Sequence, residues 1–133
     1  MVVRIRIMRQ RKPTENTVED ELEWLCSSLG FCEAIDRDRT AQNIFKQLIR
    51  SSHDGKGLKS DDLADIVGKS RGAVVNHLNK LISSGLVVRR GTRYEMRENT
   101  LHNTIAEMRR DMDRIFEDME KVADEIDRQM RGE

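Results

Sequence analysis

Residues 63–96 read LADIVGKSRGAVVNHLNKLISSGLVVRRGTRYEM and combine two short helical patterns with a hairpin pattern. Ser60, which is followed by two aspartates, is expected to cap the first helix, and Gly68 is expected to end it. Ser70 is expected to cap the second helix, whose apolar residues recur at helical spacing until Gly85. Two extended runs then flank a Gly-Thr pair, which favours a type II′ hairpin turn. The predicted order is helix, turn, helix and hairpin.

Helical patterns also precede and follow this stretch. Thr17 is the expected N-cap of an amphipathic helix that Gly30 ends, and a second helix is expected to contain residues 41–49. Residues 2–7 alternate apolar and basic side chains, as a short strand does. From Leu101 onward, apolar residues follow a heptad pattern. The sequence therefore predicts a mainly α-helical fold with a small β-hairpin.

Charge is arranged in four blocks, although the net charge of the 133 residues is zero. Residues 1–14 carry +5, residues 15–39 carry −6, residues 40–97 carry +6 and residues 98–133 carry −5. Two basic regions separated by acidic helices are expected when one face of a protein meets phosphate groups and the other parts do not.

Residues 63–96 resemble the winged helix-turn-helix of bacterial and archaeal regulators, closest to the ArsR-like and MarR-like groups. The residues that carry the resemblance are Leu63, Ala64, Gly68, Val74, Leu78, Leu81, Gly85 and Leu86. Lys69 departs from the family pattern, which usually has an apolar turn residue at this position. The resemblance implies a DNA-binding transcription regulator. Together with the flanking helical patterns and the charge blocks, it divides the chain into a basic arm or short strand (1–16), an N-terminal helix and linker (17–39), a winged helix-turn-helix (40–97) and a long dimerisation helix (98–133).

The helix that begins at Ser70 is the expected recognition helix. If its apolar residues face inward, small and polar residues face outward. Asn76 is suited to pair with adenine, Arg71 with guanine or phosphate, and the Ala73 methyl group with thymine. Solvated helices carry similar residues, so a merely solvent-exposed face is the alternative. The expected DNA contacts are Lys69, Ser70, Arg71, Gly72, Ala73, Asn76, Asn79 and Lys80, with Arg89, Arg90, Gly91, Thr92 and Arg93 in the wing.

The hairpin places like charges opposite each other if its turn has two residues. In that register Arg90 faces Arg93, and Arg89 faces Tyr94. Like charges directly across a strand pair destabilise a hairpin, and an anion such as a backbone phosphate would relieve this cost. The alternative is that both arginines extend into water, with Glu95 nearby.

The last helix has an apolar face that is too wide for a single coiled-coil seam. Its heptad positions are Leu101, Ile105, Met108, Met112, Ile115, Met119, Val122 and Ile126, with Phe116 beside them. We expect this face to form a homodimer and to pack also against the first helix, of its own or the other subunit. The contacts expected from the first helix are Val18, Leu22, Leu25 and Leu29. A binding groove for another protein or a hydrophobic effector is the alternative.

Other features of the sequence indicate less. Cys26 and Cys32 are interpreted as structural or incidental, with a metal or redox site as the alternative. The basic arm at residues 4–12 either enters a minor groove or completes the dimer as a strand. We find no catalytic constellation and no phosphate loop, and no apolar run of membrane length or signal peptide.

The sequence as a whole predicts a cytoplasmic, homodimeric transcription regulator that binds double-stranded DNA, is not an enzyme and has no cofactor. The alternatives are a winged-helix module that joins a protein assembly, and a regulator that responds to a metal or to redox state. The sequence does not indicate an effector.

Overall fold

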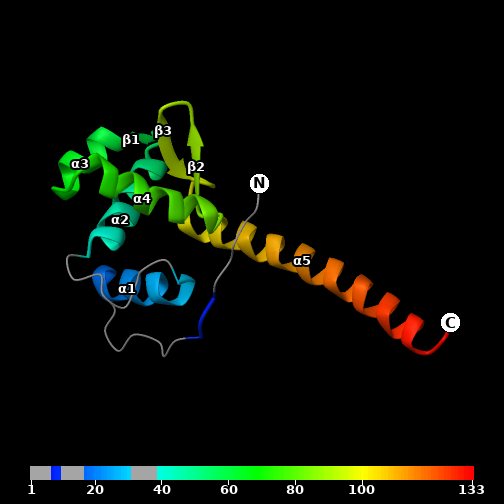
Figure 1. Cartoon of the computed structure of the whole chain (residues 1–133). Coiled ribbons are helices and arrows are strands. Elements are labelled where there is room, and N and C mark those ends of the chain that lie inside the picture. The colour runs from blue at the N-terminus through cyan, green and yellow to red at the C-terminus, as the bar shows by residue number, and fades with distance from the viewer. Residues whose placement is uncertain (1–6, 10–16, 31–38) are drawn as a thin grey trace.

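The computed structural model describes residues 7–9, 17–30 and 39–133 (Figure 1). Within these residues the fold is mainly helical with one small sheet, as the sequence predicts. The elements in chain order are α1 (Val18–Leu29), α2 (Thr40–His53), β1 (Leu58–Lys59), α3 (Ser60–Val67), α4 (Arg71–Ser83), β2 (Val87–Arg90), β3 (Arg93–Met96) and α5 (Leu101–Met130). Helices α2, α3 and α4 pack together beside the sheet, and α5 extends away from them.

The predicted helix ends are confirmed in most places. The Thr17 hydroxyl accepts from the amide of Asp20 at 3.2 Å, and Gly30 ends α1 with a φ of 72°. Ser70 caps α4 by accepting from the amide of Ala73 at 3.2 Å. These side chains satisfy amide groups that the first turn of a helix leaves without partners.

The predicted cap of α3 is wrong. Lys59 is the N-cap residue of α3 and makes no side-chain capping bond, while Ser60 is the first helical residue and is buried. The Ser60 hydroxyl instead accepts from Nε of Arg71, 3.4 Å away at the start of α4. Ser60 is therefore used in a contact between two helices and not in capping its own helix.

The sheet has the strand order β1-β3-β2, and the hairpin register is the predicted one. Arg90 pairs with Arg93, and Arg89 pairs with Tyr94. Gly91 has a φ of 64°, whereas Thr92 is not among the positive-φ residues. Positive φ at the first turn residue alone fits type II′ and excludes type I′, which needs it at both.

The strand β1 was not predicted from the sequence. Leu58 and Lys59 pair with Tyr94 and Arg93 of β3, about 35 residues later in the chain. Gly57 precedes β1, and a Cβ atom placed on it would lie 2.8 Å from Cβ of Arg93. A glycine is therefore needed where this segment approaches the wing.

The hydrophobic core joins all five helices to the wing. Its fully buried members include Cys26, Ile44, Phe45, Leu48, Leu63, Val74, Leu78, Leu81 and Leu86. Helix α1 contributes Leu22 and Leu29, and α5 contributes Met108, with Leu101 and Ile105 packed against the cluster. The first turns of α5 thus complete the core of their own domain.

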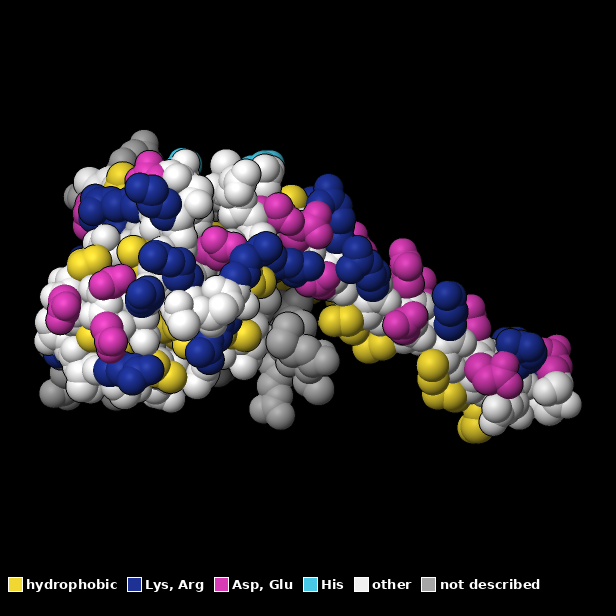
Figure 2. All heavy atoms as spheres, turned by 90° about the horizontal axis from the view of Figure 1, so that it is seen from above, with side chains coloured by type: hydrophobic (Ala, Val, Ile, Leu, Met, Phe, Trp, Pro, Cys, Tyr) yellow, Lys and Arg dark blue, Asp and Glu magenta, His cyan; other side chains and the backbone are white. Residues whose placement is uncertain are grey.

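The rest of α5 leaves the domain. Every residue from 113 to 133 is exposed, and Figure 1 shows this part as a single helix that projects from the globular body. Its apolar residues form one row, which we call the apolar stripe: Ile115, Phe116, Met119, Val122, Ile126 and Met130, with exposed fractions of 44–83%. Figure 2 shows hydrophobic side chains along one edge of this helix and charged side chains along the other.

Some predicted features lie outside the described residues. These are most of the basic arm and its strand pattern, the linker at residues 31–38, and Cys32. In the part of the chain that the structure describes, no helix is long and apolar enough to cross a membrane.

Candidate nucleic-acid interface

Helix α4 has one buried face and one exposed face, as its apolar spacing predicts. Val74, Leu78 and Leu81 are buried in the core, because they recur every three or four residues and so lie on one side of the helix. The predicted recognition residues Gly72, Asn76 and Asn79 are exposed, as are Ser70, Arg71 and Lys80, while Ala73 is half-buried.

The N-terminal part of α4 is open enough for another molecule to approach. A Cβ atom placed on Gly72 would meet no atom within 4 Å. Asn76 follows one turn later on the same exposed side. Small side chains here allow a helix backbone to come close to a groove of duplex DNA.

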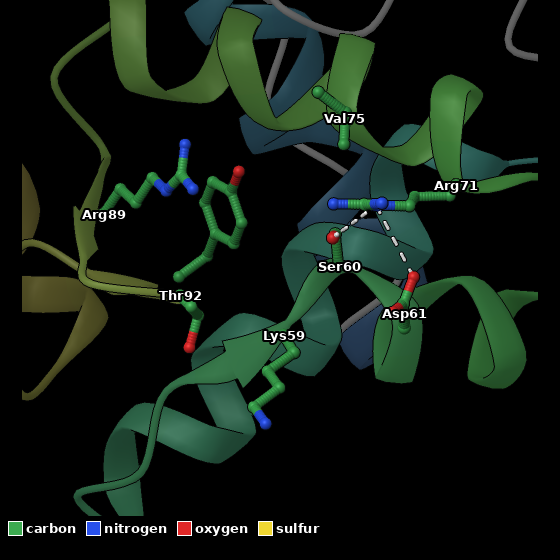
Figure 3. Close-up of a pocket in the computed structure, with 8 residues that line it drawn as sticks. Lys59, Ser60, Asp61, Arg71, Val75, Arg89 and Thr92 are labelled. Atoms are coloured by element: carbon green, nitrogen blue, oxygen red, sulfur yellow. Dashed lines mark hydrogen bonds and ion pairs between the residues drawn. The ribbon is translucent and has the colours of Figure 1, made fainter.

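Arg71 does not extend freely from the start of α4. Its Nε lies 3.5 Å from a carboxylate oxygen of Asp61 and donates to the Ser60 hydroxyl. Figure 3 shows the guanidinium group lying over the first residues of α3, with both partners on the same side. Both charged side chains are more than two-thirds exposed, so the ion pair is weak and water can compete for it.

A hollow of about 300 Å³ lies between α4 and the wing. Its lining residues come from β1, α3, α4 and the hairpin, and they are Lys59, Ser60, Asp61, Arg71, Val75, Arg89, Thr92 and Tyr94. Three of these side chains are cationic and one is a carboxylate. The hollow therefore has an excess of positive charge, which favours an anion.

Lys59 and Tyr94 belong to this hollow but were not predicted as site residues. Lys59 is placed there because β1 pairs with β3, and no local pattern in the sequence indicates that pairing. Tyr94 is buried, and the guanidinium carbon of Arg89 lies 5.6 Å from the centre of its ring. This cation–π contact holds Arg89 beside the hollow.

The arginines of the wing have partners within the protein. Arg90 pairs with Glu95, and Arg93 donates from Nη1 to the carbonyl oxygen of Gly57 at 2.9 Å. Arg89 donates from Nε to the carbonyl oxygen of Gly91 at 3.0 Å. The repulsion between Arg90 and Arg93 is thus relieved within the protein, which agrees with the predicted alternative of a nearby Glu95 more than with a phosphate between the two arginines.

The structure gives no support to a metal site in the residues that it describes. No group of three or more His, Cys, Asp or Glu side chains there is arranged to hold a metal ion. Cys26 is fully buried in the core contributed by α1. It therefore packs as an apolar side chain does.

Comparison with known proteins identifies the central segment. Residues 43–88, from α2 to the start of the wing, match the family model described as bacterial regulatory protein, arsR family. The chain therefore carries an ArsR-like helix-turn-helix, the domain of a DNA-binding transcription regulator, and regulators with this domain are generally not enzymes. Neither a curated protein nor a solved structure matches the chain.

Proposed function

We propose, starting from the arsR-family helix-turn-helix of residues 43–88, that this chain is a sequence-specific transcription regulator that acts as a homodimer in the cytoplasm. The recognition helix α4 enters the major groove, and the wing lies on the phosphate backbone. The observation that carries the proposal is the open, polar outer face of α4 beside a hollow with excess positive charge.

The residues of α4 divide between base reading and backbone contact. Asn76 is exposed in the second turn and has the paired donor and acceptor that adenine requires in the major groove. Arg71 is turned toward Asp61 and the hollow, which favours a phosphate over a base edge. Sequence preference is therefore assigned to Asn76 and its small neighbours Gly72 and Ala73.

The wing and the hollow supply contacts that do not depend on DNA sequence. Arg89, Lys59 and Arg71 line the hollow from three different elements, and Thr92 adds a hydroxyl group at the wing tip. A phosphate that occupies this hollow bridges the wing and α4. Such contacts fix the register of a protein on duplex DNA without reading bases.

The apolar stripe of α5 supports dimerisation. Residues 112–130 extend about 27 Å at 1.5 Å per residue, and the exposed apolar side chains run along this length on one side. A stripe of this size outside the core is unusual for a monomer and is typical of a protein contact. Two copies joined here present two recognition helices, and dimers of this class read half-sites about 34 Å apart.

The experiment that tests the proposal measures binding of the full chain to random duplex DNA across a salt series, and then selects bound sequences from a random duplex pool. We expect affinity to fall steeply with salt, and we expect selection to enrich a paired half-site. Asn76→Ala should change the enriched sequence, whereas Arg89→Ala should weaken binding to all sequences alike.

The opposite results define the alternative. A dimer that binds no duplex DNA even at low salt would contradict the regulator and favour a winged-helix module of a protein assembly. Equal losses for specific and random DNA on changing Asn76 would contradict the assignment of the recognition face.

A further inference from the structure

Arg97 and Asp111 join the wing to α5 through a bidentate ion pair, which we call the Arg97–Asp111 fork. Arg97 directly follows β3, and Asp111 lies in the third turn of α5. Both terminal nitrogens of Arg97 donate to the carboxylate: Nη1 to Oδ2, and Nη2 to Oδ1 at 3.2 Å. The two side chains are 25% and 16% exposed. Two parallel, charge-assisted hydrogen bonds fix direction as well as distance.

Both ends of the fork are held in place. The amide of Arg97 donates to the carbonyl oxygen of Leu86, just before β2, at 2.9 Å. On the helix, Thr104 is fully buried, and its hydroxyl donates to the carbonyl oxygen of Thr100 and accepts from the amide of Glu98 at 3.2 Å. The base of the wing and the first turns of α5 therefore form one rigid unit.

The fork stands where α5 leaves the domain. From residue 113 onward all residues are exposed. Their hydrogen bonds and ion pairs with described residues stay within α5 and the three residues after it, and none of them reaches the wing or helices α1–α4. Arg114 contacts Asp111 at 3.1 Å within that helix, and Glu107 lies 3.8 Å from Arg97. Among the residues that the structure describes, the fork is thus the last polar contact between the domain and the projecting helix.

A rigid helix amplifies a small change of angle at its base. Over the roughly 27 Å of residues 112–130, a tilt of about 10° displaces the far end by about 5 Å. In a dimer joined through the apolar stripe, the same tilt applies in both copies. The angle at the fork therefore determines how far apart the two recognition helices lie.

We propose that the Arg97–Asp111 fork sets the spacing between half-sites that the dimer selects. The inference rests on the proposed function, because it requires a dimer that reads DNA. Arg97 and Asp111 are positioning residues: they touch neither DNA nor the partner copy but fix the angle between the DNA-reading domain and the dimer contact.

The test uses the full chain and a pool of duplexes in which two copies of the selected half-site are separated by spacers of varied length. We expect the original protein to enrich one spacing. Asp111→Asn weakens the fork, so the enriched spacings should broaden, and affinity for the preferred spacing should fall about tenfold. The half-site sequence and the dimeric state should not change.

Two further variants separate position from charge. Asp118→Asn makes the same change one heptad later, on an exposed residue of the projecting helix, and should leave the spacing unchanged. Arg97→Lys retains the charge but cannot form the bidentate contact, so it should broaden the range of enriched spacings as Asp111→Asn does. Arg97→Lys carries the test if Asp111→Asn does not fold.

The outcomes distinguish this inference from the proposed function. A folded, dimeric variant with unchanged spacing overturns the role of the fork and leaves the regulator intact. Loss of dimerisation in the variant also overturns it, because the apolar stripe lies beyond the fork. If the original protein binds no paired half-sites, the proposed function itself fails.

Discussion

Arg90 and Arg93 stand directly opposite each other across the two-residue turn of the wing, and each is held by a different group of the protein. Arg90 pairs with Glu95, two residues past Arg93, and Arg93 reaches back to the carbonyl oxygen of Gly57 before β1. The two guanidinium groups are thereby drawn toward different partners. This arrangement keeps both arginines at the tip of the wing without destabilising the hairpin.

The Glu95 carboxylate should support the wing while it weakens DNA binding. Glu95→Gln removes the charge that neutralises Arg90, so the hairpin should lose at most about 1 kcal/mol of stability, and added salt should restore part of it. Affinity for random duplex DNA at low salt should rise, because a negative charge near the phosphates is lost. Urea unfolding and fluorescence anisotropy measure the two effects. Glu117→Gln, on the projecting helix, is the matched control, and an equal rise there would contradict the prediction.

Asp61 should restrain Arg71 in the protein without DNA. Asp61→Asn removes the carboxylate 3.5 Å from Nε of Arg71, so affinity for random duplex should increase several-fold, and the salt dependence should become steeper by about one counterion. Binding isotherms over a range of salt concentrations measure both quantities. Asp65→Asn makes the same change elsewhere on α3. If the two variants behave alike, the effect comes from overall charge and not from release of Arg71.

The apolar stripe should be needed for association but not for folding. Met119 is 50% exposed and lies beyond the domain core, so Met119→Glu should convert the dimer to a monomer while the unfolding midpoint of the winged domain changes little at equal monomer concentration. Sedimentation equilibrium measures the state of association. Lys121→Glu introduces the same side chain on another face of the helix and should leave the dimer intact. A variant at Met119 that remains a dimer would exclude the stripe as the contact.

The Arg97–Asp111 fork should make stability depend on pH in the acidic range. The hydrogen bond from Arg97 holds the pKa of the Asp111 carboxyl below its ordinary value of 3.8. A lowered folded-state pKa means that the stabilisation is fully present well above pH 3.8 and is lost as the pH falls through the lowered value.

Asp111→Asn should therefore cost roughly 1 kcal/mol of unfolding free energy at neutral pH, and the difference from the original protein should shrink as the pH falls from about 5 to about 3. Urea unfolding at a series of pH values measures this difference, with Asp118→Asn as the control. A difference that stays constant over that range would show that packing and not charge accounts for the loss.

Several features could be predicted from the sequence because they depend on neighbours within a few residues. Ser70 caps α4 because its hydroxyl reaches an amide three residues later. Gly91 takes positive φ at the first position of a two-residue turn, and that turn alone determines that Arg90 faces Arg93. The periodicity of Val74 and its apolar neighbours likewise decides which face of α4 is exposed.

Other features arise from contacts between distant segments, which no local pattern encodes. The strand β1 forms because Leu58 pairs with Tyr94 of β3. The Ser60 hydroxyl accepts a hydrogen bond from Arg71 instead of capping α3. The heptad pattern runs without a break from Leu101 to Ile126, yet packing assigns its first turns to the core of the domain and the remainder to solvent.

The sequence by itself thus determined the helices, the hairpin and its register, and the open face of α4, because hydrogen bonds and periodicity act over short distances along the chain. Only the tertiary structure decided which groups pair with the wing arginines and that Lys59 lines the hollow beside α4. It also decided that Arg97 forms an ion pair with Asp111 where α5 begins to project from the domain. These arrangements depend on which side chains of remote elements come within hydrogen-bonding distance once the core has packed.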